Sequence, residues 1–483
     1  MQYRAIVRIL GLLITIFSIT MIPPALIAYG FNDGAGVPFI LSFLLCLFIG
    51  FAIWYPNRRY RSEMKVRDGF LIVVLFWTVL GAAGAIPLML SPNPDLTIAE
   101  AMFEAFSGLT TTGATILTDI ETLPKAILYY RQQLQWLGGM GIIVLAVAIL
   151  PMLGIGGMQL YRAETPGPVK DNKITPRIAD TAKHLWYIYL SLTLACMLSF
   201  YLAGMSWFDA ICHAFSTVSI GGFSTYDNSI GHFNSPLING ICVLFLMISA
   251  VSFPLHFAAV RGKSIRTYFR DPEFKTFLLI QMVIIMICFS VLLKSSTYAG
   301  AAETFNHALF QAVSISTTSG FTTDGFAGWP LFLPILLIFS SFIGGCAGST
   351  GGGMKVVRVL LLAMQGVREL NRLVHPRAVY VIKLGRRPVA DRIVEAVWGF
   401  FAAYALVFVV IMLLLIMTGL DDITAFSATA ACLNNLGPGL GEVADNFSAI
   451  PDASKWVLTI AMVFGRLEIF TLLVLFTPAF WKS

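Results

Sequence analysis

The chain has 483 residues, of which 57% are hydrophobic and 12% are charged. Soluble domains carry about 25% charged residues, so this composition excludes an ordinary soluble protein. The formal net charge of +6 comes from basic residues that cluster in particular loops, a pattern that does not indicate nucleic-acid binding. The seven cysteines stand singly in hydrophobic segments, without a CxxC or Cys/His metal spacing.

Several stretches run for more than twenty residues without Asp, Glu, Lys or Arg. A helix needs about 20 such residues to cross a bilayer. We therefore predict an all-α polytopic membrane protein. Its first elements are two transmembrane helices at about 8–30 and 37–54, within an N-terminal region of residues 1–55.

A long–short–long pattern then occurs four times. We call these stretches units one to four, with predicted bounds 56–160, 161–262, 263–388 and 389–483. The long segments are about 69–92 and 127–155, 184–204 and 236–260, 274–294 and 330–354, and 393–418 and 454–479; the short ones are about 98–109, 208–218, 301–316 and 422–433. The short segments cannot span a bilayer, so we expect re-entrant helices buried by their neighbours.

The loop charges predict one orientation for all four units. Basic residues gather between one unit and the next, for example at Arg58–Arg67 and Arg261–Arg270, whereas acidic residues such as Asp119, Asp227 and Asp324 follow the short segments. The positive-inside rule then places both termini and the loops between units in the cytoplasm. The repeats are parallel, which argues against carriers built from inverted repeats.

Each short segment leads from an Ala to a Gly twelve positions later, and these glycines are Gly113, Gly222, Gly320 and Gly437. The residues before them share no side-chain type, because Ile220 and Leu436 stand where other units have Thr, Ser, Gly or Asn. Any common ligand must therefore be backbone carbonyl oxygen, which Gly can orient through its freedom in φ. A fourfold carbonyl ring suits a weakly hydrated monovalent cation. A turn without function would suffice for one such segment but is a poor explanation of four in register.

Two further features lie at membrane depth. The run Gly344–Gly353 cannot hold a regular helix, so we expect an irregular loop across the cavity below the filter and a candidate gate. A close-packed kink without gating is the alternative. Arg466 either faces the ion path or satisfies carbonyls structurally, and it should not pair with Glu468 two positions along a helix. Arg131 is expected at the membrane interface.

Polar residues of the short helices are expected to bond neighbouring units rather than to act as catalysts: Glu104, Ser107, His213, Ser216, Gln311 and Ser314.

Six motifs resemble the TrkH/KtrB/HKT superfamily of potassium transporters, and within it the membrane subunits of bacterial Trk uptake systems. They are TTTGAT (Thr110–Thr115), IGGFST (Ile220–Thr225), TTSGFTT (Thr317–Thr323), NNLGPGLG (Asn434–Gly441), GGCAGSTGGG and FGRLEIFTLL (Phe464–Leu473). The resemblance covers essentially the whole chain. It implies a multi-pass homodimer in the bacterial inner membrane, with one pore per protomer. It also implies a cytoplasmic TrkA-type partner that responds to NAD and ATP.

The resemblance also assigns residue roles. It implies potassium binding at Thr111, Thr112, Gly113, Ile220, Gly221, Gly222, Thr318, Ser319, Gly320, Asn435, Leu436 and Gly437, and gating by Gly344, Gly345, Gly348, Ser349, Thr350, Gly351, Gly352, Gly353 and Arg466. In plant relatives a Ser at the first filter position accompanies sodium permeation, so Gly113 favours potassium. K⁺ is then the transported ion, with no organic cofactor in this chain. The alternative class is a membrane-embedded enzyme or a carrier of organic substrates. An enzyme would need paired catalytic groups, and no HExxH or Ser/His pair lies at membrane depth. A carrier of organic substrates would need a shaped site rather than a fourfold ring. Channel-like and proton-coupled transport both stay open.

Overall fold

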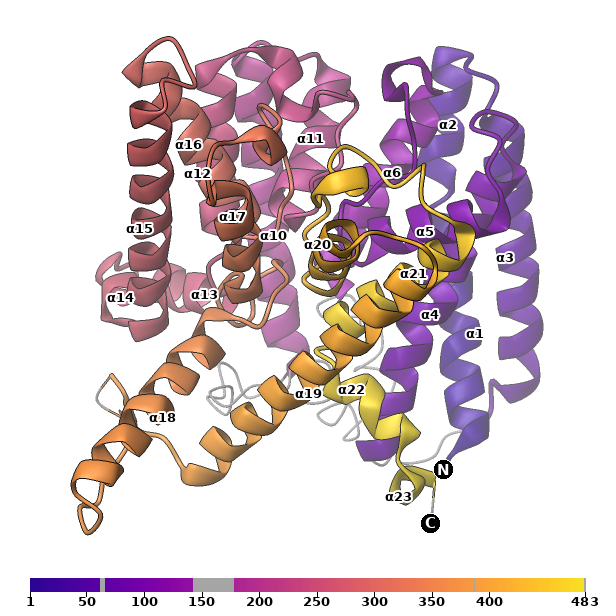
Figure 1. Cartoon of the computed structure of the whole chain (residues 1–483). Coiled ribbons are helices and arrows are strands. Elements are labelled where there is room, and N and C mark those ends of the chain that lie inside the picture. Colours follow the sequence, from indigo (N-terminus) through magenta and orange to yellow (C-terminus); the bar gives the residue numbers. More distant parts are fainter. Residues whose placement is uncertain (61–65, 142–177, 386, 482–483) are drawn as a thin grey trace.

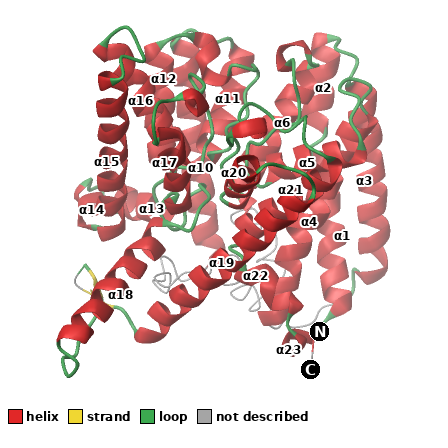
Figure 2. Cartoon of the chain, in the orientation of Figure 1, coloured by secondary structure: helices red, strands yellow, loops and turns green. Residues whose placement is uncertain are grey.

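The protein is all-α, as predicted (Figure 2). The computed structural model describes residues 1–60, 66–141, 178–385 and 387–481. In this part of the chain the only strands are β1 (Lys383–Leu384) and β2 (Arg387–Pro388), which form one short antiparallel pair. Six described helices are long and apolar enough to cross a membrane, or eight if each of two bent helix pairs is one span. The chain is therefore an integral membrane protein.

The N-terminal region contains the two predicted spans. The first is interrupted between α1 (Tyr3–Ile19) and α2 (Ile22–Phe31), where prolines open α2, and the second is α3 (Gly36–Asn57). Helices α1 and α3 approach closely at glycines: a Cβ on Gly11 would lie 2.8 Å from the Gly50 carbonyl oxygen. Small residues at such crossings let apolar helices pack in lipid.

The four predicted units follow around a common centre (Figure 1). Their first long helices are α4 (Val66–Leu90), α10 (Ile178–Leu202), α15 (Pro272–Lys294) and α19 (Asp391–Met417), and their short helices are α5 (Ile98–Leu109), α11 (Trp207–Ser219), α16 (Ala301–Ser316) and α20 (Asp422–Leu433). Three of the short helices are capped at their N-terminus by a side chain that accepts a backbone N–H of the first turn; the capping residues are Thr97, Ser206 and Asp421. The short helices are buried between the long ones, as re-entrant helices must be.

The second long helix of each unit departs from the prediction. These segments begin with α6 (Lys125–Gly139), α12 (Pro236–Ser249), α17 (Leu333–Ile343) and α21 (Asp452–Arg466). We expected continuous helices over 236–260 and 454–479, and that was wrong; the third segment, 330–354, was expected to be interrupted by its glycine run. α12 gives way to α13 (Phe253–Arg261) with an 89° bend, and α21 gives way to α22 (Phe470–Leu473) with a 105° bend. The predicted continuation of α6 beyond residue 141 lies outside the described residues.

Each break has a local cause. Pro254 lies in the first turn of α13, where its ring is tolerated but cannot continue the preceding helix. The glycine run separates α17 from α18 (Val356–Val374), so the irregular segment predicted at Gly344–Gly353 is confirmed. After α21, Glu468 and Ile469 both have positive φ, which ends the helix at Arg466.

The remaining elements are short: α14 (Arg266–Arg270), α23 (Pro478–Trp481), η1 (Ile120–Thr122), η3 (Ser229–Phe233), η4 (Phe326–Gly328), η5 (Gly441–Val443) and η6 (Val474–Phe476). Helix α18 extends away from the helical body at the lower left of Figure 1.

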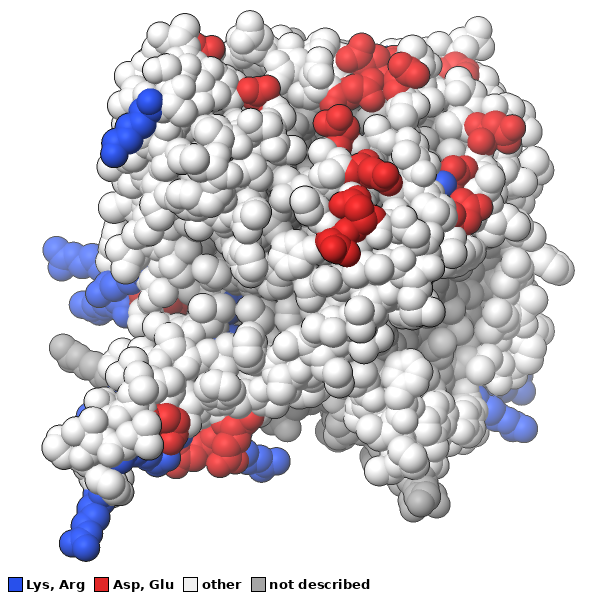
Figure 3. Space-filling model, viewed as in Figure 1, with Lys and Arg blue, Asp and Glu red and all other residues white. Residues whose placement is uncertain are grey.

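Charges are separated between the two ends of the molecule. In Figure 3 acidic residues gather over the upper part of the visible face and basic residues lie mainly toward the lower end. Both termini lie at this lower end (Figure 1). This distribution agrees with the loop charges, which predicted one direction for all four units.

Candidate functional site: a ring of four backbone segments

The four segments that follow the short helices share an alternating backbone. We call them the ring segments: Thr111–Gly113, Ile220–Gly222, Thr318–Gly320 and Asn435–Gly437. The first residue of each has a positive φ, of 57°, 57°, 70° and 53° respectively. The glycines have φ of 81°, 82°, 80° and 104°, whereas the middle residues do not have positive φ. Such alternation lets successive carbonyl groups of one segment point to the same side.

The segments close a ring through their glycines. A Cβ on Gly113 would lie 2.1 Å from the Gly221 carbonyl oxygen, and one on Gly222 would lie 1.9 Å from that of Ser319. A Cβ on Gly320 would lie 2.2 Å from the Leu436 oxygen, and one on Gly437 would lie 2.9 Å from the Thr112 oxygen. Each unit therefore touches the next, and unit four returns to unit one. Glycine allows this approach together with a positive φ without a shift of the neighbouring backbone.

The side chains of the ring segments are buried away from solvent. Ile220 and Leu436 are fully buried in hydrophobic clusters, and Thr112 and Ser319 are equally inaccessible. The common feature of the four segments is therefore main-chain geometry, as their differing side chains predicted.

A cavity of about 600 Å³ opens at the glycine end of the ring. All four glycines line it, together with three carboxylates, Asp227, Asp324 and Asp445. Partial burial, and then the nearby carboxylates of Glu121 and Asp119, raise the pKa of Asp227. An acidic entrance of this kind raises the local concentration of cations.

The short helices hold the backbone that follows the ring within their own unit. Glu104 accepts the backbone N–H of Ile116 at 3.0 Å, and Gln311 donates to the Asp324 carbonyl at 2.6 Å. The ring nitrogens of His213 contact the Asp209 carbonyl and the Ser224 hydroxyl, and Ser314 donates to the Phe321 carbonyl. We expected these four side chains to bond neighbouring units, but each of the five contacts lies within one unit. The hydroxyl oxygens of Ser107 and Ser216 are buried without a hydrogen-bond partner.

Arg131 is not at the membrane interface, which corrects our expectation. It is 1% exposed, and its Nε lies 2.7 Å from a carboxylate oxygen of Glu104. A buried guanidinium needs such a partner, because an unpaired charge in an apolar interior is strongly unfavourable. The missed signal was Glu104 itself, a carboxylate in the middle of the short helix α5 between Phe103 and Ala105.

The glycine loop lies against the other end of the ring. The backbone N–H of Gly352 donates to the Thr318 hydroxyl at 2.6 Å, and that of Gly353 donates to the Asn434 carbonyl at 3.0 Å. Thr350 donates to the Val218 carbonyl at 3.0 Å. The loop therefore contacts units two, three and four directly beneath their ring segments. Lys355 donates to the Gly351 carbonyl and ties the loop to the start of α18.

Arg466 lies beside this loop at the end of α21. Its guanidinium donates to the Thr111 hydroxyl at 3.2 Å, to the Thr350 carbonyl at 3.2 Å and to the Gly138 carbonyl. Glu468 forms an ion pair with Arg358. The predicted lack of an Arg466–Glu468 pair rested on a continuous helix, and that premise was wrong because the helix ends at Arg466.

Within the described residues, no group of three or more His, Cys, Asp or Glu side chains could hold a metal ion. The seven cysteines are free and buried.

Comparison with known proteins gives the family. A family model described as "TrkH: Cation transport protein" matches residues 36–483. The chain belongs to the TrkH family of cation transport proteins. It is 64% identical over 485 residues to the Trk system potassium uptake protein TrkH of Vibrio parahaemolyticus, and 61% identical over 483 residues to that of Escherichia coli K12. Each alignment covers both chains completely.

A solved structure agrees with this family membership. The crystal structure of the potassium transporter TrkH from Vibrio parahaemolyticus matches with a TM-score of 0.92 and 62% identity, and the match covers all of both chains. The fold predicted for the TrkH family is therefore confirmed, with two N-terminal helices and four helix–pore-loop–helix repeats. These relatives are named as transporters, so the prediction of a transport protein rather than an enzyme is also confirmed.

Proposed function

We propose that this chain takes up potassium across the bacterial inner membrane through the ring of four backbone segments. The observation that carries the proposal is the cyclic contact of Gly113, Gly222, Gly320 and Gly437 with carbonyl oxygens of the next unit. Four such loops can replace the hydration shell of K⁺ with carbonyl oxygens. The Trk names of the full-length relatives support potassium as the ion.

The charge separation supports one orientation of the chain in the membrane. The acidic cavity at the glycine end is the outer entrance in this proposal, and the basic end with both termini faces the cytoplasm. Ions pass from the cavity through the carbonyls of Thr111, Thr112, Ile220, Gly221, Thr318, Ser319, Asn435 and Leu436 and those of the four glycines.

The glycine loop and Arg466 form the gate in this proposal. The residues concerned are Gly344, Gly345, Gly348, Ser349, Thr350, Gly351, Gly352 and Gly353, which stand across the inner end of the ring. Arg466 holds Thr350 of the loop and Thr111 of unit one with the same guanidinium nitrogen. Opening would require these hydrogen bonds to break together.

The wider assembly is also a proposal. The Trk system naming of the relatives supports a multi-subunit uptake system. We propose a homodimer with one pore per protomer, and a cytoplasmic TrkA-type subunit that transmits NAD and ATP levels to the gate.

Competition in proteoliposomes tests the proposed function. Uptake of a potassium tracer should be reduced by excess K⁺ and Rb⁺, much less by Na⁺, and not by an amino acid. Gly113→Ser should reduce the preference for K⁺ over Na⁺. Competition by an organic substrate, or unchanged selectivity in the Gly113→Ser variant, would contradict the proposal and favour a carrier with a shaped substrate site.

A further inference from the structure

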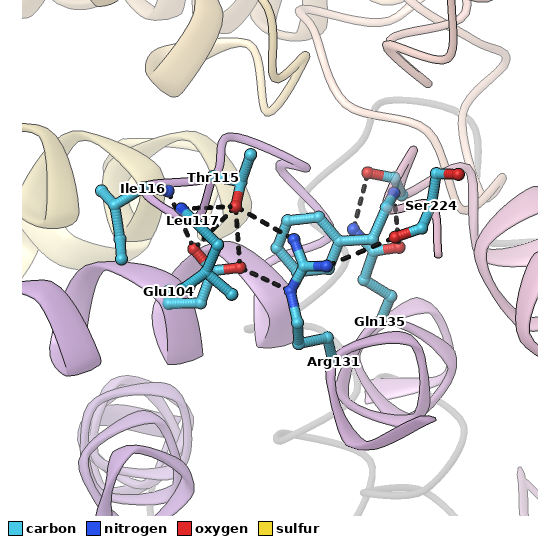
Figure 4. Close-up of polar contacts among 9 residues, drawn as sticks. Glu104, Thr115, Ile116, Leu117, Arg131, Gln135 and Ser224 are labelled. Atoms are coloured by element: carbon cyan, nitrogen blue, oxygen red, sulfur yellow. Dashed lines mark hydrogen bonds and ion pairs between the residues drawn. The ribbon is translucent and has the colours of Figure 1, made fainter. Parts of the chain in front are cut away.

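Helix α6 of unit one directs two polar side chains at residues 221–224 of unit two, in and after its ring segment (Figure 4). Arg131 and Gln135 are four positions apart, so they share one face of the helix. Both are buried, at 1% and 0% exposure. Neither residue belongs to a ring segment, yet both bond the backbone of residues 221–224.

The Gln135 amide holds the ring segment of unit two at two points. Its Nε2 donates to the Gly221 carbonyl at 2.7 Å, and its Oε1 accepts the backbone N–H of Phe223 at 3.1 Å. These bonds lie on either side of Gly222. Gln135 thus fixes the positions of the carbonyl group before the ring glycine and of the peptide after it.

Gln135 also explains why unit two has a glycine at its middle ring position. A Cβ on Gly221 would lie 2.4 Å from Cδ and 2.5 Å from Oε1 of Gln135. The equivalent residues Thr112, Ser319 and Leu436 carry side chains of their own. In unit two this space is filled by a side chain from unit one.

Ile220 makes this restraint important. It is β-branched and fully buried, and its φ of 57° is an unfavourable conformation for such a residue. A strained backbone of this kind persists only where its surroundings hold it in place. The two hydrogen bonds from Gln135 supply part of that hold on the adjacent peptides.

Arg131 fixes the helix that carries Gln135. Its guanidinium pairs with Glu104, donates to the Ser224 carbonyl at 3.3 Å, and lies 4.2 Å from the centre of the Phe223 ring. It also donates to Thr115, whose hydroxyl in turn contacts Glu104 (Figure 4). The register of α6 against unit two is therefore set by a buried charged network.

We propose that Gln135 is a specificity-determining positioning residue, which orients the Gly221 carbonyl for a monovalent cation. The inference rests on the proposed function of the ring. Without Gln135, the Ile220–Gly221 backbone can relax, and the ring can then adapt to a smaller ion such as Na⁺. Unit two should therefore be a quarter of the ring whose backbone position, and with it selectivity, depends on a side chain of unit one.

Gln135→Met tests the proposal, because Met has a similar length and cannot form either hydrogen bond. The matched control is Gln133→Met on the same helix: Gln133 is also buried, and it donates to the Thr20 carbonyl at 2.8 Å, away from the ring. The net contribution of one buried hydrogen bond corresponds to a factor of roughly 2 to 10 in an equilibrium constant. We therefore expect Gln135→Met to lower the K⁺ over Na⁺ preference in proteoliposome competition by about 3- to 10-fold. Gln133→Met should leave that ratio unchanged at a similar melting temperature.

Gly113→Ser is measured in parallel to separate two failures. If it changes selectivity while Gln135→Met behaves like Gln133→Met, the ring function stands and the role of Gln135 is refuted. If neither Gly113→Ser nor Gln135→Met changes selectivity, the proposed function and this inference fall together.

A second pair of variants tests the shared space. Gly221→Ser should abolish uptake, because the new side chain meets Gln135. Adding Gln135→Ala removes that conflict and should restore part of the uptake. Equal loss in the single and double variants, with both proteins folded by size-exclusion chromatography, would contradict the packing argument.

Discussion

The ring segments and the backbone beneath them differ in how closely the four units repeat. In the ring, every unit places a positive φ at the same two positions and one glycine against the next unit. Beneath the ring, unit three contributes the glycine loop and unit four contributes Arg466. The second long helix is bent by 89° in unit two, between α12 and α13, and by 105° in unit four, between α21 and α22. The repeated part provides equivalent oxygens around one axis. The backbone beneath the ring differs between units, and there a movement of the glycine loop alone would break the hydrogen bonds that hold it.

In the proposed function this difference corresponds to two tasks, ion selection and gating. Selection among ions requires several carbonyl groups at similar distances, which fourfold repetition of the backbone supplies. A gate requires an element with two arrangements, and one loop held by a few hydrogen bonds is enough. Variants in the ring should therefore change selectivity or abolish transport, whereas variants beneath it should change the rate.

The largest effect is expected for Gly222→Ala. The added Cβ would lie 1.9 Å from the Ser319 carbonyl oxygen at a φ of 82°. Backbone strain of about 1–3 kcal/mol adds to this clash. Potassium uptake should fall at least about tenfold in a vesicle assay. Gly240→Ala is the control, because a Cβ there would meet no atom within 4 Å. Normal uptake by Gly222→Ala would contradict the closed ring.

Arg131→Met should destabilise the contact between units one and two. The substitution leaves Glu104 buried without its cation, which costs about 3–5 kcal/mol in comparable ion pairs. The melting temperature of the detergent-solubilised protein should fall clearly. Combining Arg131→Met with Glu104→Gln removes the unpaired charge and should recover part of the loss. An unchanged melting temperature in the single variant would show that the pair does not stabilise this contact.

Deletion of Gly351 and Gly352 should raise the potassium flux several-fold. These residues lie under the ring, where Gly352 bonds Thr318. Arg466→Ala should act in the same direction but less strongly, because it removes one attachment of Thr350 and leaves the loop intact. Stopped-flow flux measurements with equal protein per vesicle would check both. A folded deletion variant with equal or lower flux would refute the gate and favour a close-packed kink.

The smallest effect concerns the outer cavity. Asp227 has a raised pKa, so its carboxylate gains a proton at a higher pH than an ordinary Asp. As the external pH falls through this pKa, the entrance loses one negative charge and attracts cations less. Uptake at low K⁺ and low ionic strength should therefore weaken on acidification, and Asp227→Asn should be less pH-sensitive. An identical pH profile in that variant would exclude Asp227 as the cause.

The ring could be predicted from the sequence because it depends on local, repeated backbone chemistry. Glycines at one offset after four short amphipathic segments indicated both the ring and its carbonyl ligands. The alternating φ values fit that interpretation, and even Ile220 adopts the positive φ that its position requires.

The parts that were missed depend on contacts between distant residues. The pairing of Arg131 with Glu104 joins two helices, and Gln135 acts on a segment 86 positions away. The end of α21 at Arg466 could likewise not be predicted, because no glycine or proline follows Arg466 until Pro478. Charges and amides in otherwise apolar segments beside the ring were the available signal. The partners of these side chains could be identified only once the fold was known.

Location of the bound ion tests the central claim most directly. A crystal structure of this protein grown with Tl⁺ or Rb⁺ would reveal the ion by anomalous scattering. We predict peaks on the axis of the ring, surrounded by the carbonyl oxygens of Thr112, Gly221, Ser319 and Leu436. Peaks confined to the carboxylates of the outer cavity, with none inside the ring, would contradict selection by backbone carbonyls.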